Sequence, residues 1–146
     1  MTAKEYLRQI AVLDAKINRR QKEVEELKTL ATHITTTAEG DRVQSSGSMD
    51  RMAGIVARWV DLETEIGQMI DHLVEVKHRI IGEIHQLEDA RYIQLLEMRY
   101  VDMDTFEQIA VNMQYDIRWV YRLHGFALQE FANKHLTSES HVRPVL

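Results

Sequence analysis

Two long stretches of the chain repeat apolar residues at alternating spacings of four and three, with charged residues between them. This heptad spacing predicts two long helices that each bury one stripe of side chains. The stripes are Tyr6, Ile10, Leu13, Ile17, Arg20, Val24, Leu27, Ala31 and Ile34, and then Ile55, Trp59, Leu62, Ile66, Met69, Leu73, Val76, Ile80, Ile84 and Leu87. We interpret Arg20 as an arginine whose stem packs at the edge of a helix pair while its charge stays in water, with a register-setting role as the alternative.

The residues between the stripes, 35–49, are a cluster of threonine, serine and glycine without apolar periodicity, which predicts a loop. A parallel arrangement of the two helices would stretch this loop along their whole length, so we expect an antiparallel hairpin. Val56, Ile70 and Ile81 widen the second stripe, and a wide stripe favours burial against more than one helix. The hairpin is therefore predicted to pair with a second copy of the chain.

After Leu87 the apolar pattern shortens and predicts smaller helices. Asp89 is placed to cap a helix over residues 90–101, because its side chain can accept hydrogen bonds from the first backbone N–H groups. Thr105 and Gln108 have the spacing of a capping box, which predicts the start of the next helix.

Residues 105–128 contain two short apolar stripes that flank the turn residues 114–116. Asp116 is placed to cap the helix that follows the turn. The stripes are Ile109, Ala110 and Met113, and then Val120, Leu123, Ala127 and Leu128. This pattern predicts a helix-turn-helix inside a three-helix unit.

A helix-turn-helix presents the outer face of its second helix to the major groove of DNA. Arg118, Tyr121 and Arg122 fall on that outer face. An arginine can donate two hydrogen bonds to guanine, and a tyrosine can donate one to a phosphate. Ile117 and Trp119 flank this face and are candidates for contact with thymine methyl groups, the DNA backbone or a protein partner. The five residues are therefore the candidate DNA-binding site, and a plain helical bundle with ordinary surface arginines is the alternative.

The charge of the chain limits how tightly one copy can bind DNA. The net charge is −5, and residues 89–136 carry five Lys and Arg against seven Asp and Glu. Because neutralisation of phosphates supplies most of the non-specific affinity for DNA, we expect a single copy to bind weakly. Two linked copies on one DNA would raise the effective affinity without new contacts.

Other functional classes lack the residues that their chemistry needs. The chain has no cysteine and no apolar run of the roughly 20 residues that a membrane span requires, which suits a cytoplasmic protein. Glu75 and His78 have the Glu-x-x-His spacing of di-metal bundles, but the chain has no second such motif. Asp61 and Glu65 lie one turn apart on a helix that offers no pocket for acid–base chemistry. We therefore expect no metal, no cofactor, no membrane contact and no enzymatic activity.

The segment TFEQIAVNMQYDIRWVYRLHGFAL resembles region 4 of sigma-70-type factors, which recognises the promoter −35 element. The chain is more closely similar to phage late transcriptional regulators of the RinA/ArpU type, through MTAKEYLRQIAVLDAKINRR, DRVQSSGSMDRM and LLEMRYVDMDTFEQIA. The resemblance implies a DNA-binding activator of phage or prophage late genes that acts with host RNA polymerase. Gln114 stands where glycine is usual in the turn and is expected to be left-handed, and Trp119 and Phe126 stand where basic residues are common.

Together these observations predict an all-α chain with a long N-terminal antiparallel helical hairpin, coiled-coil-like, followed by a small helix-turn-helix domain. The expected divisions are 1–88 for the oligomerisation hairpin, 89–134 for the helix-turn-helix domain and 135–146 for a flexible tail. The predicted protein is a homodimer or higher homo-oligomer that binds double-stranded DNA in the cytoplasm of a bacterial host. The alternative is a module that docks on RNA polymerase or another phage protein without reading DNA.

Overall fold

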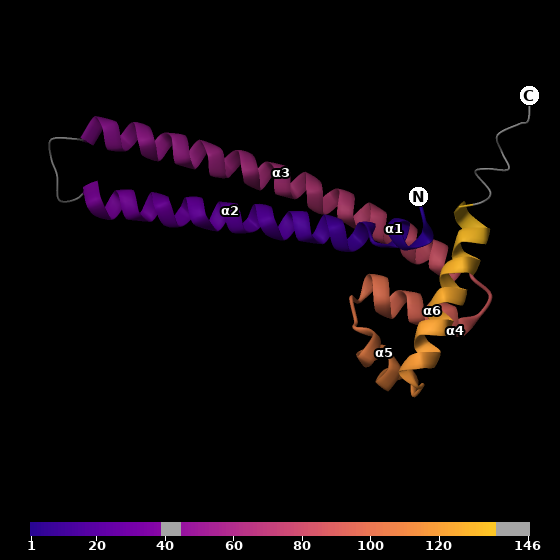
Figure 1. Cartoon of the computed structure of the whole chain (residues 1–146). Helices are drawn as coiled ribbons and strands as arrows, with labels where there is room; N and C mark the ends of the chain where they lie inside the picture. Colours follow the sequence, from indigo (N-terminus) through magenta and orange to yellow (C-terminus); the bar gives the residue numbers. More distant parts are fainter. Residues whose placement is uncertain (39–44, 137–146) are drawn as a thin grey trace, which may run out of the picture. The chain divides into compact units, whose positions relative to one another are not determined.

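Every regular element in residues 1–38 and 45–136, which the computed structural model describes, is helical, so the predicted all-α class is confirmed (Figure 1). Arg8 interrupts the first helices for a single residue, and its N–H still donates to the Lys4 carbonyl at 3.0 Å. The elements are α1 (Ala3–Leu7), α2 (Gln9–Ala38), α3 (Ser45–His85), α4 (Ala90–Leu96), the π-helical turn η1 (Glu97–Val101), α5 (Phe106–Met113), α6 (Ile117–Phe131) and the π-helical turn η2 (Ala132–Leu136).

The chain divides into two compact units that do not coincide with the expected boundary near residue 88. The first unit combines Met1–Val12 with everything from Leu73 onward, and the second is Leu13–His72. Consequently, α1 and the C-terminal part of α3 belong with the small helices α4, α5 and α6 rather than with the hairpin.

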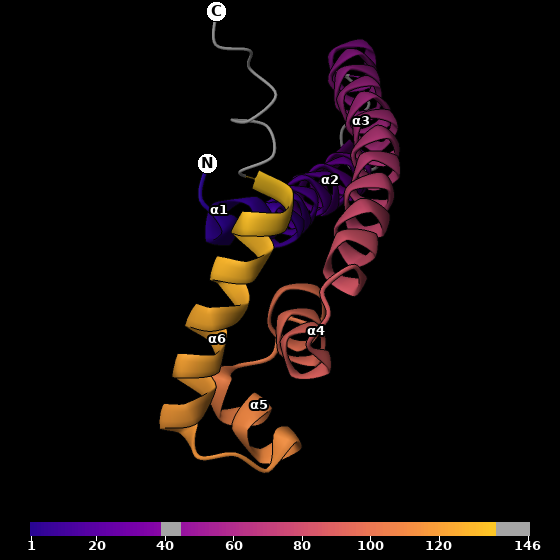
Figure 2. The ribbon, with the colours of Figure 1, turned by 90° about the vertical axis from the view of Figure 1, so that its right-hand side faces the viewer.

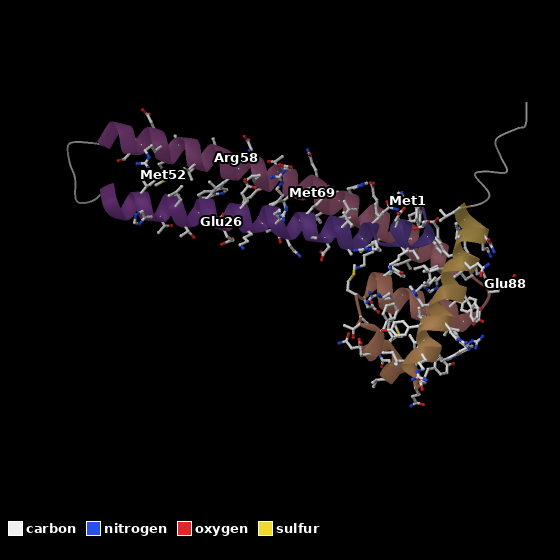
Figure 3. All side chains as sticks on the ribbon, in the orientation of Figure 1. Met1, Glu26, Met52, Arg58, Met69 and Glu88 are labelled. Atoms are coloured by element: carbon white, nitrogen blue, oxygen red, sulfur yellow. The ribbon has the colours of Figure 1, made fainter. Side chains whose placement is uncertain are left out.

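The second unit is a pair of antiparallel helices, α2 and α3, which Figure 1 shows side by side. The Arg20 guanidinium of α2 lies 3.5 Å from the Glu65 carboxylate of α3. Lys28 comes later in α2, and its Nζ lies 5.6 Å from the ring centroid of Trp59, which comes earlier in α3 than Glu65. Contacts that advance along one helix and retreat along the other define the antiparallel direction. Buried apolar side chains form the seam between the helices, where side chains from both are drawn in Figure 3. They are Ile17, Val24, Ala31 and Ile34 from α2 and Leu62 and Ile66 from α3.

Arg20 lies at the edge of this seam with its side chain 40% exposed. Its guanidinium contacts Glu23 at 3.1 Å and Glu65 at 3.5 Å. The arginine thus keeps its charge in water beside two carboxylates, as the sequence interpretation held. Exposed ion pairs of this kind contribute about 0–1 kcal/mol each, so the apolar seam rather than the charges stabilises the pair.

The predicted loop 35–49 was too long. Helix α2 continues to Ala38 and α3 begins at Ser45, so helix covers residues at both ends of the predicted loop, and residues 39–44 lie outside the described part. Threonine and serine have low helix propensity, but the difference from good helix formers is below about 1 kcal/mol per residue. Extending an existing helix by one residue is much easier than starting one, so a long helix can run into such a stretch.

The first unit is built around fully buried side chains of α4, α5 and α6, and Figure 2 shows these helices turned to face the viewer. Leu7 of α1 and Ile80 and Ile84 of α3 are equally buried. The members of this core with no exposed surface are Leu7, Ile80, Ile84, Leu95, Leu96, Ile109, Val120, Leu123, Ala127 and Phe131. The predicted three-helix unit is therefore completed by α1 and by the C-terminal end of α3, both of which the sequence analysis assigned to the hairpin.

Tyr6 joins α1 to both α3 and α6. Its hydroxyl donates to Glu83 Oε1 at 2.5 Å, and its ring centroid lies 5.8 Å from that of Phe131. Burial raises the pKa of the Tyr6 hydroxyl above its ordinary value, and the hydrogen bond to Glu83 raises it further. The sequence pattern placed Tyr6 only in the hairpin stripe and gave no sign of these partners.

The first two residues of the expected flexible tail, 135 and 136, are helical. The turn η2 continues the chain to Leu136, and residues 137–146 lie outside the described part. His135 Nε2 donates to the Glu83 carbonyl at 2.8 Å, and its ring lies 4.7 Å from Phe131. These contacts to α3 and α6 explain why the chain is still helical at this position.

Candidate nucleic-acid interface

The turn between α5 and α6 closes with two hydrogen bonds back to α5. The Tyr115 N–H donates to the Ala110 carbonyl at 3.0 Å, and the Gln114 N–H donates to the Val111 carbonyl at 3.3 Å. This pattern requires a left-handed residue, and Gln114 has φ 59° and ψ 41°, which confirms the expectation from the sequence. A residue with a side chain costs about 1–2 kcal/mol in this conformation, so the turn holds some strain.

The predicted caps of the small helices are all present. Asp89 accepts from the Arg91 N–H at 2.9 Å, and Asp116 accepts from the Arg118 N–H at the same distance. Thr105 and Gln108 form the reciprocal capping box at the start of α5. These bonds satisfy N–H groups that a helix start leaves without partners, so each helix begins at a defined residue.

The packing of α5 against α6 sets which face of α6 is exposed. Ile109 has no exposed surface and Ala110 is 9% exposed, while Val120, Leu123 and Ala127 of α6 are fully buried. The small side chain of Ala110 lets the two helices approach closely. Because these α6 positions face inward, the helix period leaves Arg118, Tyr121, Arg122 and Gly125 facing outward.

Three of the five predicted site residues lie together on this outer face. Arg118 and Arg122 are exposed, and Tyr121 is 50% exposed. Within residues 1–38 and 45–136, neither guanidinium forms an ion pair. The face therefore offers two arginines that form no ion pair with a described residue, one helical turn apart, beside a half-exposed tyrosine.

The other two predicted residues, Ile117 and Trp119, are half-buried. Residues two apart in a helix do not share a face. Ile117 and Trp119 therefore lie on opposite flanks of the outer face. Trp119 packs edge-on against Phe126, with ring centroids 6.5 Å apart, and Phe126 is 48% exposed. The Trp119 flank is thus a small aromatic patch without charge.

The flank on the Tyr121 side carries an aromatic cluster that the sequence reasoning missed. Phe106 is at its centre, with the rings of Tyr121 and His124 each 5.0 Å away. The guanidinium carbon of Arg99 lies 4.2 Å from the Phe106 centroid, a cation–π contact. Helical spacing predicts that Tyr121 and His124 are neighbours on α6. It does not predict their contacts with Phe106 of α5 and, through it, Arg99 of η1, because those contacts depend on how the helices pack.

A hydrogen bond 2.7 Å long joins the Tyr100 hydroxyl to His124 Nε2. Burial raises the pKa of Tyr100 above its ordinary value. Burial and, to a smaller extent, the nearby charges of Arg99 and Lys4 together lower the pKa of His124 to about 4. His124 is therefore neutral near pH 7, and the positive charge of this flank comes from Arg99 and Lys4.

The surface of α5 has a different character. A shallow depression there is lined by Asp104, Glu107, Gln108, Val111 and Asn112, and Val111 is 80% exposed. The combination of carboxylates and an exposed valine suits contact with protein better than contact with phosphates.

In the part of the chain that the structure describes, His, Asp and Glu side chains do not gather in groups of three that could hold a metal ion. Over the same residues, none of the helices combines the length and apolar character of a membrane span. Comparison with protein-family models, with curated proteins and with solved structures finds no match.

Proposed function

We propose that the chain is a DNA-binding regulator of transcription that uses α6 as its recognition helix. The observation that carries this proposal is the exposed face of α6, where Arg118 and Arg122 form no ion pair with any described residue and Tyr121 lies beside them. The strained turn at Gln114 and the cap at Asp116 hold this face at a defined angle to α5. The sequence resemblance to phage late regulators supports a role at phage or prophage genes, with host RNA polymerase, in the bacterial cytoplasm.

The spacing of the two arginines suits base recognition. Four residues of α-helix advance about 6 Å, close to the rise of two base pairs in DNA. Each arginine that donates two hydrogen bonds to guanine contributes about 1–3 kcal/mol of discrimination between bases. Tyr121 is placed to donate to a phosphate or to pack on a base edge.

Self-association would supply the affinity that one acidic copy lacks. Val60 and Ile70 of α3 are 49% and 40% exposed, and each follows a seam position by one residue in the sequence. An apolar stripe of this kind on a long helix favours pairing with a second copy. A two-fold dimer would bind two half-sites, typically one helical turn of DNA apart.

The test compares two pairs of charge-removing substitutions in the full chain. Duplexes are first selected from random DNA by the purified protein, and affinities are then measured by fluorescence anisotropy at several salt concentrations. Arg118→Gln with Arg122→Gln should weaken the selected duplex by at least about tenfold, since two charged contacts are lost. Lys16→Gln with Arg19→Gln removes the same charge from exposed positions of α2 and should change affinity little. Equal losses in both double variants would refute the role given to α6.

A second function, docking on RNA polymerase or another phage protein without reading DNA, is favoured by the acidic surface of α5. Val111 supplies exposed apolar contact area within this surface, and the Trp119–Phe126 pair supplies more on α6. The two functions differ in their response to salt, because binding to DNA weakens steeply as salt rises. If no duplex is enriched from random DNA and the polymerase is bound at high salt, the docking function replaces the first proposal.

A further inference from the structure

The first unit contains a cavity of about 310 Å³ beside the aromatic cluster. All of its walls come from the same compact unit. Residues far apart in the sequence meet here, because α1 and the start of α2 form one wall, and η1, α5 and α6 form the others. The lining residues are Lys4, Arg8, Ala11, Arg99, Tyr100, Met103, Phe106 and His124.

The charged side chains that line this cavity are all cationic. They are Lys4, Arg8 and Arg99, and no carboxylate is among the lining residues. Within the described ranges, Lys4 and Arg8 take part in no ion pair, although the net charge of the chain is −5. Three cations that face one cavity without a counter-charge repel one another, and a bound anion would remove that repulsion.

Arg99 is the best oriented of the three. One of its terminal nitrogens donates to the Asp104 carbonyl at 3.0 Å, and its guanidinium carbon lies 4.2 Å from the Phe106 ring centroid. These contacts fix the guanidinium and leave several of its five N–H groups for a ligand. The Tyr100 hydroxyl and the His124 ring add polar groups to the same cavity.

We propose that this cavity binds a phosphate group. Phosphate matches the lining because its charge of up to two is spread over oxygens that accept from several donors at once, and arginine donates to it in pairs. The volume leaves room for part of the molecule that carries the phosphate, against Phe106 and Met103. The phosphate could belong to a small free compound or to the backbone of a duplex, since Phe106 also contacts the exposed Tyr121 of α6.

The first experiment titrates the full-length protein with inorganic phosphate and follows the His124 ring and the arginine side chains by NMR, with chloride at equal ionic strength as the reference. We expect saturable shifts at His124 and Arg99. The doubly substituted chain Lys4→Gln with Arg8→Gln should bind phosphate at least about tenfold more weakly. The matched variant Lys16→Gln with Arg19→Gln should bind as the wild type does. Shifts that chloride reproduces, or equal binding by the two variants at unchanged thermal stability, would overturn the proposal.

A second arm identifies the source of the phosphate and rests on the proposed DNA-binding function. A selected duplex is added to the phosphate-loaded protein. Displacement of inorganic phosphate supports a backbone phosphate in the cavity, and simultaneous binding supports a small free phosphate compound. If the protein selects no duplex at all, the proposed DNA-binding function is wrong. The phosphate titration still tests whether the cavity binds phosphate.

Discussion

Acidification is expected to destabilise the first unit through His124. Its pKa in the folded chain is about 4, against an ordinary value of 6.5. As the pH falls below 6.5, the unfolded chain takes up a proton that the folded chain does not, so the free energy of unfolding falls. The fall continues until about pH 4, where the folded form is protonated as well. The contribution of this histidine to the free energy of unfolding is thus fully present above pH 6.5 and is lost as the pH falls towards 4.

The size of the effect follows from the two pKa values. Between about pH 7.5 and pH 5, a histidine with these values lowers the free energy of unfolding by about 2 kcal/mol. His124 is partly exposed, so solvent screening reduces the figure to between about 1 and 2 kcal/mol. The groups that face its ring are the cations Arg99 and Lys4, the Tyr100 hydroxyl and the uncharged Phe106.

Urea unfolding of the wild type and of His124→Gln at the two pH values measures this effect. Other groups titrate in the same range, so the relevant quantity is the difference in pH dependence between the two proteins and not the stability of either one. Between the two pH values, the free energy of unfolding of the glutamine variant should fall by about 1 to 2 kcal/mol less than that of the wild type. His78→Gln, which removes an exposed histidine of α3, serves as the control. Identical pH dependence in the wild type and His124→Gln would refute the reasoning.

Three further predictions concern the turn, the core and the hairpin. Gln114→Gly should raise the free energy of unfolding in urea by about 1 kcal/mol, because glycine adopts φ 59° without strain, and a decrease would contradict the strain. Phe131→Ala should lower it by about 3–5 kcal/mol, since the ring is fully buried, and a loss under about 1 kcal/mol would contradict its place in the core. Val60→Lys with Ile70→Lys should weaken self-association in light scattering by at least about tenfold, whereas Val111→Lys on α5 should not. Equal association in both would exclude the α3 stripe as the interface.

The elements that local rules control could be predicted from the sequence. Asp89, Thr105 with Gln108, and Asp116 act on backbone groups within three residues, so their spacing was sufficient to predict the caps. The left-handed Gln114 was expected from the resemblance, in which glycine is usual at this position of the turn. Helical periodicity likewise gave the outward direction of Arg118 and Arg122.

Contacts between distant segments could not be predicted in this way. Tyr6 has heptad spacing, and that spacing does not reveal that its partners are Glu83 and Phe131. The basic cavity was missed for the same reason, because Lys4 and Arg99 meet only after α1 packs in the first unit. The predicted loop was too long because threonine and serine weaken a helix by amounts smaller than the cooperativity that extends it.

The acidic sum of the chain counted against DNA binding when the charges were considered along the sequence. The folded chain changes the weight of that argument, because a phosphate responds to charges within about one Debye length, roughly 8 Å at physiological salt. Lys4, Arg8 and Arg99 line the cavity and no carboxylate does, so cations are the charges nearest to a phosphate bound there. The Phe106–Tyr121 contact links the cavity to the outer face of α6. An acidic chain can therefore still offer a phosphate a locally cationic site, because the net charge of −5 is a sum over the whole sequence.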